Sequence, residues 1–175
     1  MGVAGRGGRV SHHGTVDRAA ETRPYLSGLR LSGRRVVVVG GGVVATRRSL
    51  RLLASGADLV VVSPRVSAEL ALLAGQDRLC WLDRGYRPGD LAGAWYALAA
   101  TDDERVNRAV SAEAEEARVF CVRADRAAEA TAWTPASGEV DGLQVAVLAG
   151  RNPREAARVR DLLVGWLVRL RRSAA

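Results

Sequence analysis

Three consecutive glycines followed by a helical pattern are the residues of this chain best suited to bind an anion. They directly follow four consecutive valines, residues 36–39, and Ala45 comes three residues after the last glycine. The order Gly40-x-Gly42-x-x-Ala45 matches the dinucleotide-binding fingerprint in its Ala-ended form, in which a pyrophosphate rests on the amide groups of a helix N-terminus. We therefore expect Gly40, Gly41 and Gly42, together with the helix-starting Val43 and Val44, to bind a dinucleotide cofactor.

The second expected strand covers residues 59–62, and the residues directly after it would hold the ribose of the cofactor. Dinucleotide sites commonly carry an acid at this position, whereas this chain has Ser63, Pro64 and Arg65. A serine hydroxyl and main-chain groups could replace the acid, and Arg65 could instead favour a 2′-phosphate. These residues leave both NAD and NADP open, with NAD preferred.

Two further sets of polar residues also follow expected strands. Thr101 and Asp102 stand between a strand at 95–99 and a helix at 104–117, where either residue could cap the helix and both could form a second wall of the cofactor crevice. Asp125 follows a strand at 119–122 and is flanked by Arg123 and Arg126. A carboxylate so flanked is most often one half of a solvated ion pair, but its place beyond a strand end makes it a candidate for chemistry.

The elements that must position these residues are predicted by the spacing of apolar side chains. The valine strand, the helix after it and the strand at 59–62 form one right-handed crossover unit, which implies parallel pairing. A short helix at 69–73 and a strand at 79–82 continue the α/β pattern. Segments 130–136 and 143–148 are strand-like and are joined by the turn-rich residues 137–142, which predicts a hairpin outside the parallel sheet.

A long helix is expected from Asn152 and Pro153 onward. Its apolar stripe consists of Ala156, Val159, Leu162, Leu163, Trp166 and Leu170, opposite an Arg-rich face. Such a stripe must be buried somewhere, and a two-stranded hairpin is marginal in water. A second copy of the chain is therefore the expected partner.

Composition and charge restrict the function classes. The 175 residues include 48% hydrophobic ones and carry a net charge of +7. The excess of arginine lies at the two ends, without lysine, aromatic platform or recognition helix, so we expect no nucleic-acid partner. No apolar run is long enough to cross a bilayer, and the N-terminus has no apolar signal core, so we expect no membrane association and a cytoplasmic location.

Histidine and cysteine give no sign of a metal site. The two histidines, His12 and His13, both fall in the Gly- and Arg-rich N-terminal tail. Cys80 and Cys121 lie far apart, each inside an expected buried strand, and are interpreted as ordinary core residues. We therefore expect no metal ligands in the fold.

Several separated segments together resemble the precorrin-2 dehydrogenase / sirohydrochlorin ferrochelatase family, the N-terminal module of siroheme synthase. The resemblance extends from about Pro24 to Leu170. It rests on the glycine-turn segment 31–47, on 99–103 with Val106 and Asn107, on Phe120-Cys121 with Asp125, on Pro135-Ala136, and on 145–147 before Pro153. The order and the spacing of these segments agree with the family.

The resemblance implies a Rossmann-type parallel sheet followed by a small dimerisation hairpin and a C-terminal helix. Its expected divisions are a disordered basic tail (1–23), an NAD-binding domain (24–125), a dimerisation region (126–150) and the final helix (151–175). The implied activity is the NAD-dependent oxidation of precorrin-2 to sirohydrochlorin by a homodimer, with Asp125 as the catalytic residue acting as a general base. Ferrous iron insertion stays open, as does the alternative of a non-catalytic module that senses NAD(H).

Overall fold

The structure is a computed structural model that describes residues 23–150 and 152–173. The expected N-terminal tail, with His12 and His13, lies outside the described residues apart from Arg23. None of the helices within the described ranges is both long and apolar enough to span a membrane.

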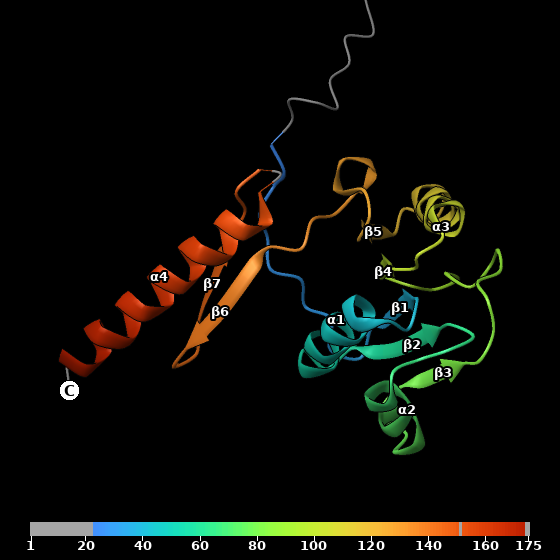
Figure 1. Ribbon diagram of the computed structural model, residues 1–175, viewed down its shortest axis with the longest axis horizontal. Coiled ribbons are helices and arrows are strands. Elements are labelled where there is room, and N and C mark those ends of the chain that lie inside the picture. The colour runs from blue at the N-terminus through green and yellow to red at the C-terminus, as the bar shows by residue number, and fades with distance from the viewer. Residues whose placement is uncertain (1–22, 151, 174–175) are drawn as a thin grey trace, which may run out of the picture.

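Five short strands form one parallel sheet in the order β3-β2-β1-β4-β5 (Figure 1). They are β1 (Arg35–Val39), β2 (Asp58–Val62), β3 (Cys80–Leu82), β4 (Tyr96–Ala99) and β5 (Phe120–Arg123). The helices between them are α1 (Val43–Ala54), α2 (Ala68–Gly75) and α3 (Glu104–Glu116). Because β1 pairs with β2 on one side and with β4 on the other, the strand order reverses beside β1, and the crevice for a ligand lies at its carboxyl end.

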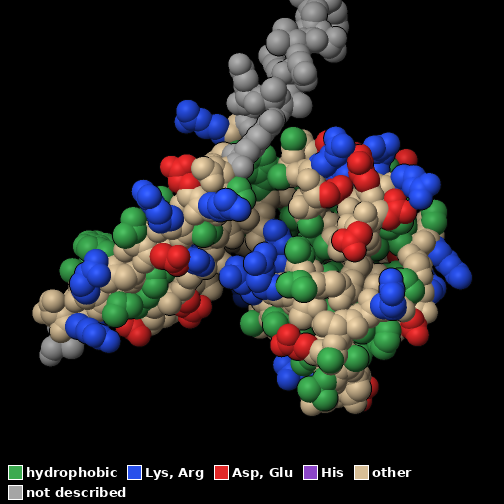
Figure 2. Space-filling model, viewed as in Figure 1, with side chains coloured by type: hydrophobic (Ala, Val, Ile, Leu, Met, Phe, Trp, Pro, Cys, Tyr) green, Lys and Arg blue, Asp and Glu red, His purple; other side chains and the backbone are tan. Residues whose placement is uncertain are grey.

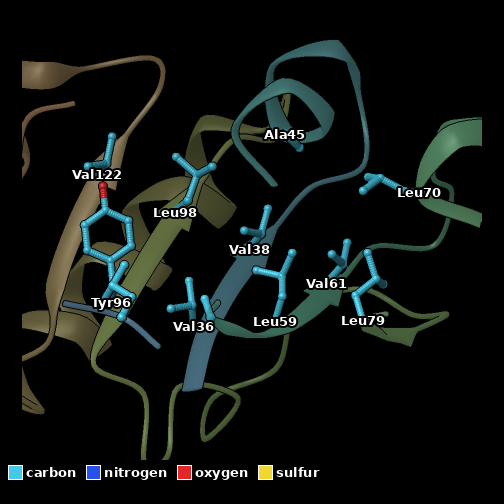
Figure 3. Close-up of a cluster of buried hydrophobic side chains, with 12 residues drawn as sticks. Val36, Val38, Ala45, Leu59, Val61, Leu70, Leu79, Tyr96, Leu98 and Val122 are labelled. Atoms are coloured by element: carbon cyan, nitrogen blue, oxygen red, sulfur yellow. The ribbon is translucent and has the colours of Figure 1, made fainter. Parts of the chain in front are cut away.

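The valine strand is buried on both faces, as its sequence predicts, and it separates two cores. Val36 and Val38 pack with Leu59, Val61 and the residues of α1 and α2 (Figure 3). On the opposite face Val37 and Val39 pack with Val110 of α3. Successive side chains of a strand point to opposite faces, so one run of apolar residues holds helices to both sides of the sheet.

The expected hairpin is present but begins later in the chain than predicted. Its strands are β6 (Ala136–Val140) and β7 (Leu143–Val147), so residues 130–135 lead to the hairpin and residues 137–140 belong to a strand instead of a turn. Asp141 and Gly142 form the two-residue connection with φ of 48° and 77°. Positive φ at both positions is typical of the type I′ turn, which fixes Val140 opposite Leu143.

The last helix, α4 (Pro153–Ser173), packs on this hairpin, and the two elements stand beside the sheet and its helices (Figure 1). A side chain at Gly138 of β6 would lie 2.6 Å from Val164, so this glycine permits the close approach of α4. The apolar stripe of α4 is largely exposed within the described chain: Leu162 is 63% exposed, Trp166 53% and Leu170 50%.

Cys80 departs from its predicted burial. Cys121 is buried in β5, and burial raises the pKa of its thiol to about 11, consistent with an inert core residue. Cys80 is exposed because β3 is the edge strand of the sheet and pairs only with β2. The sequence alone does not show which strand is the edge.

Candidate functional site: a dinucleotide crevice beside an arginine-lined cavity

The glycine turn follows β1 at the point where the strand order reverses. Gly40 has φ of +120°, and a Cβ there would lie 2.3 Å from the carbonyl oxygen of Ala100. A Cβ at Gly41 would lie 2.1 Å from the carbonyl oxygen of Arg65. The first two glycines are therefore required by the close approach of the backbone after β4 and after β2, whatever ligand is bound.

Gly42 differs, because among the described residues nothing lies within 4 Å of the position that its Cβ would occupy. Gly42 is the N-cap of α1, with extended backbone angles and without a described side chain that caps the helix. The first turn of α1 carries no acidic residue, and Val43 is 85% exposed. The first amide groups of α1 thus face open space with uncompensated positive character, which is what an anionic ligand requires.

The loop after β2 supports this turn from the side. The amide of Ser67 donates to the carbonyl oxygen of Gly41 (3.0 Å), and the hydroxyl of Thr46 pairs with the Ser67 hydroxyl (2.9 Å). The buried Ser63 donates its hydroxyl to the carbonyl oxygen of Arg65 (2.6 Å), which tightens the turn through Pro64. Ser63, Pro64 and Arg65 therefore lie next to the glycine turn, as their predicted role in holding a cofactor requires.

The turn after β4 is held by a buried asparagine. Asn107 of α3, 1% exposed, donates from its amide to the carbonyl oxygen of Thr101 (2.9 Å) and accepts from the Thr101 hydroxyl (2.8 Å). The predicted cap of α3 is wrong: the N-cap is Asp103, whose carboxylate accepts from the amide of Arg105 (2.8 Å). Since Asp103 takes the capping role, Asp102 stays exposed at the strand end beside Thr101.

Asp125 lies beyond the end of β5, where the sequence places it, and it is paired with Arg123. The Arg123 Nη2 atom lies 2.7 Å from Asp125 Oδ2, and its Nε atom lies 3.2 Å from Oδ1. The remaining guanidinium nitrogen contacts Glu129, in the short 3₁₀ helix η2 (Ala127–Glu129). The pair is not the solvated one that the flanking arginines suggest, because the Arg123 side chain is 1% exposed and that of Asp125 is 26% exposed.

This pairing sets the charge of the Asp125 carboxylate. Hydrogen bonding from Arg123 lowers the pKa of Asp125 below its ordinary value, and partial burial only offsets this effect in part. The Asn107 amide acts in the same direction. Asp125 is therefore a fixed carboxylate at neutral pH. Arg126, the other flanking arginine, pairs instead with Glu104 of α3 and with Glu129.

A cavity of about 900 Å³ lies between the sheet domain and the pair formed by the hairpin and α4. Asp125 lines it, together with seven arginines: Arg47, Arg48 and Arg51 of α1, Arg123 of β5, Arg126, and Arg154 and Arg160 of α4. Figure 2 shows basic side chains gathered along the boundary between these two parts. The cavity is thus open to a large anionic ligand on one side of Asp125.

Arg48 illustrates how poorly this positive charge is balanced. Its guanidinium donates to the Thr134 hydroxyl, and its Nε atom has no hydrogen-bond partner among the described residues. Burial lowers the pKa of Arg48, and the neighbouring Arg47 and Arg51 act in the same direction. A partly buried cation that forms no ion pair within the described part of the chain is stabilised when an anion enters the cavity.

Sequence reasoning names two further residues of this region, Asn107 and Arg123, but missed their structural roles. Asn107 lies on the sheet-facing side of α3 together with the buried Val110 and Ala114. A polar residue at a helix position where the apolar spacing predicts burial is the sequence signal that could have indicated its role. Arg123 is a charged residue inside a buried strand, which is a signal of the same kind. Among residues 23–150 and 152–173, no group of three or more His, Cys, Asp or Glu could hold a metal ion.

The strand order, the glycine turn at the reversal point and the uncapped start of α1 define a dinucleotide-binding Rossmann domain. Residues 28–136 match the model of a family described as putative NAD(P)-binding. The chain belongs to this family.

Comparison with individual proteins agrees with the more specific resemblance. The chain is 40% identical over 139 residues to a siroheme synthase of Ectopseudomonas mendocina, and 45% identical over 131 residues to one of Chromobacterium violaceum. These alignments cover 79% and 74% of this chain, but the chain spans only 30% and 28% of the two relatives' length.

A solved structure described as SirC, precorrin-2 dehydrogenase, superposes with a TM-score of 0.70 at 29% sequence identity. The superposition covers 81% of this chain and 70% of that structure. The predicted relation to the precorrin-2 dehydrogenases, and the predicted Rossmann-type sheet with an added hairpin and C-terminal helix, are confirmed.

Proposed function

We propose that this chain oxidises precorrin-2 to sirohydrochlorin with NAD as the hydride acceptor. The observation that carries the proposal is the placement of one fixed carboxylate, Asp125, on the wall of an arginine-lined cavity and beside Asn107, the residue that also holds the turn after β4. Resemblance to SirC, precorrin-2 dehydrogenase, and to siroheme synthases supports the choice of substrate.

The residues around the glycine turn fit the cofactor. The free amide groups at Gly42, Val43 and Val44 would hold the pyrophosphate, because the space in front of them is open and the helix start has no competing acid. We propose that residues 63–65 hold the adenosine ribose, and that Thr101 and Asp102 form the facing wall. When bound, NAD supplies the hydride-accepting chemistry.

Asp125 is proposed as the proton acceptor of the reaction. Oxidation of the tetrapyrrole removes one hydride and one proton, so a carboxylate beside the ring is needed to receive the proton. The ion pair with Arg123 keeps this carboxylate ionised at neutral pH. Its partial exposure leaves lone pairs available on the cavity side.

The arginines of the cavity are proposed to hold the carboxylates of the substrate. Precorrin-2 carries eight carboxylate groups, and guanidinium groups bind carboxylates through paired hydrogen bonds. Arg47, Arg48 and Arg51 come from α1, whose first turn is proposed to hold the cofactor, so the same helix would orient both ligands. Arg154 and Arg160 would contact the substrate from α4.

We further propose that the working unit is a homodimer, with residues 126–150 and α4 at the interface. The exposed apolar residues Leu162, Trp166 and Leu170 follow one another at intervals of four, which places them on one side of α4. An apolar stripe of this kind is covered when a second copy packs against it.

The proposal is tested by anaerobic incubation of the purified chain with precorrin-2 and NAD. We expect NADH and sirohydrochlorin to form together in wild type, and Asp125→Ala to bind NAD while turning over little. Glu116→Ala, at the exposed end of α3, is the matched control and should turn over like wild type. Cofactor binding without turnover in wild type would instead favour an NAD(H)-sensing module, and a parallel reaction with ferrous iron tests metal insertion.

A further inference from the structure

The last residue of β5 is a charged side chain in a position that strands of a parallel sheet normally fill with apolar residues. Arg123 pairs with Ala99 of β4 in the sheet register, and its side chain is 1% exposed. A guanidinium group removed from water to this extent costs free energy unless its donors are paired. The hydrogen-bond partners of Arg123 therefore indicate the role of its buried charge.

Most of the donor capacity of Arg123 is directed at Asp125. Nε and Nη2 contact the two carboxylate oxygens at 3.2 Å and 2.7 Å, in the paired arrangement that fixes both the position and the plane of a carboxylate. The backbone between the two residues is also fixed, because the amide of Ala124 donates to the carbonyl oxygen of Ala99 (2.9 Å). The carboxylate is thus held from a rigid strand and not from a loop.

We propose that Arg123 is a positioning residue that holds the Asp125 carboxylate ionised and turned towards the arginine-lined cavity. The effect of Arg123 on catalysis rests on the proposed function. The placement of the Asp125 carboxylate by Arg123 does not. A base that is held in one orientation reacts faster than one that samples several rotamers, because the entropy of alignment has already been lost.

The charged and polar groups facing Asp125 come from three elements. Arg123 of β5 and Asn107 of α3 stabilise its ionised form. Glu129 of η2 lies on the other side of the Arg123 guanidinium, and Arg126 pairs with Glu129. Without Arg123, Asp125 would share its surroundings with a second carboxylate, and its pKa would rise towards or above the ordinary value.

The sign of the effect on activity follows from the need for an ionised base. Because the pKa of Asp125 is lowered, the wild-type rate should persist to a lower pH than an ordinary carboxylate allows. Arg123→Met should move the acid limb of the kcat profile to higher pH and lower kcat by about 10²-fold. The KM for NAD should stay unchanged, since Arg123 does not contact the glycine turn.

Three further variants separate positioning from support of the fold. Arg123→Lys keeps a buried positive charge but not the paired contact, so it should restore the acid limb while recovering kcat only in part. Glu129→Gln removes the other partner of Arg123 and should leave the acid limb in its wild-type position. Arg108→Met removes an exposed arginine that pairs with Glu104 on α3, and it serves as the surface-charge control.

A second readout does not depend on turnover. We would label aspartate carboxyl carbons with ¹³C, assign the Asp125 signal by its loss in Asp125→Asn, and titrate the chain without substrate. We expect the signal to titrate below the ordinary aspartate range in wild type, at a similarly low pH in Arg123→Lys, and at a higher pH in Arg123→Met. An unshifted titration in Arg123→Met would overturn the inference. A wild-type chain that titrates as expected but does not oxidise precorrin-2 refutes the proposed function and leaves the placement of Asp125 by Arg123 standing.

Discussion

Gly42→Asp is the substitution that best separates cofactor binding from folding. Among the described residues nothing lies within 4 Å of a Cβ at Gly42, and its φ of −79° is open to any residue. Gly42 is also the N-cap of α1, a position at which aspartate is preferred over glycine. The substitution should therefore be accepted by the fold without strain.

The substitution should have opposite effects on the stability of the fold and on the affinity for NAD. A carboxylate at the N-cap should raise the free energy of unfolding by about 0.5 kcal/mol, through a cap hydrogen bond and the helix dipole. The same carboxylate would stand about 4 Å from a phosphate bound at this helix start, which costs about 4 kcal/mol at an effective dielectric constant of about 20. We therefore expect the affinity for NAD to fall by about 10³-fold in a chain at least as stable as wild type.

Calorimetric titration with NAD and thermal unfolding without ligand measure the two effects on the same samples. Gly75→Asp is the control, because it adds the same charge at a glycine whose Cβ also meets no described atom. Gly75 ends α2, the helix that returns the chain from the carboxyl end of β2 to the start of β3, so it lies at the opposite edge of the sheet. Wild-type affinity in Gly42→Asp, or an equal loss in Gly75→Asp, would refute the assignment of the pyrophosphate to this helix start.

Three other substitutions test separate parts of the structure. Gly41→Ala should lower the free energy of unfolding in urea by about 2 kcal/mol, because its Cβ would meet a backbone carbonyl at 2.1 Å, and an unchanged midpoint would contradict this packing. Asp90→Asn tests the ion pair with Arg84, which lowers the pKa of Asp90. The pKa of Asp90 is lower in the folded state than in the unfolded state, so wild type should lose this stabilisation as the pH falls through the folded-state pKa. The variant lacks the ion pair at every pH, so its free energy of unfolding should change less with pH in the acid range. Trp166→Glu should shift the chain from dimer to monomer in sedimentation equilibrium without changing its affinity for NAD, and a monomeric wild type would contradict the proposed interface.

Much of the fold could be predicted from the sequence because local patterns determine it. Four valines can only be buried on both faces, so they indicate a central parallel strand, and the glycines after them indicate the turn into a helix. Asp141 and Gly142 predict a turn by their residue types. The second hairpin strand, predicted at 143–148, agrees with β7, but the first, predicted at 130–136, lies several residues too early. Gly138 has a poor strand propensity, and the close packing of α4 over this position of β6 depends on tertiary structure.

The polar contacts were decided by tertiary structure. The sequence places Asp125 after a strand between two arginines, but it cannot show that Arg123 is buried and pairs with it while Arg126 turns to other acids. In the same way, the fingerprint requires glycine at positions 40 and 42 and leaves position 41 unspecified. Only the packed loops show that Gly40 and Gly41 are needed by neighbouring carbonyl groups and that Gly42 alone faces open space.

The physical reason for this division is the range of the interactions. Hydrophobic periodicity and turn preferences act between residues that are close in the chain, so the sequence by itself determined the strands, the helices and the glycine turn. The partner of a buried charge and the space in front of an amide group depend on segments that are brought together only by the sheet order. Tertiary structure therefore decided where the arginine-lined cavity lies and how the carboxylate beside it is held.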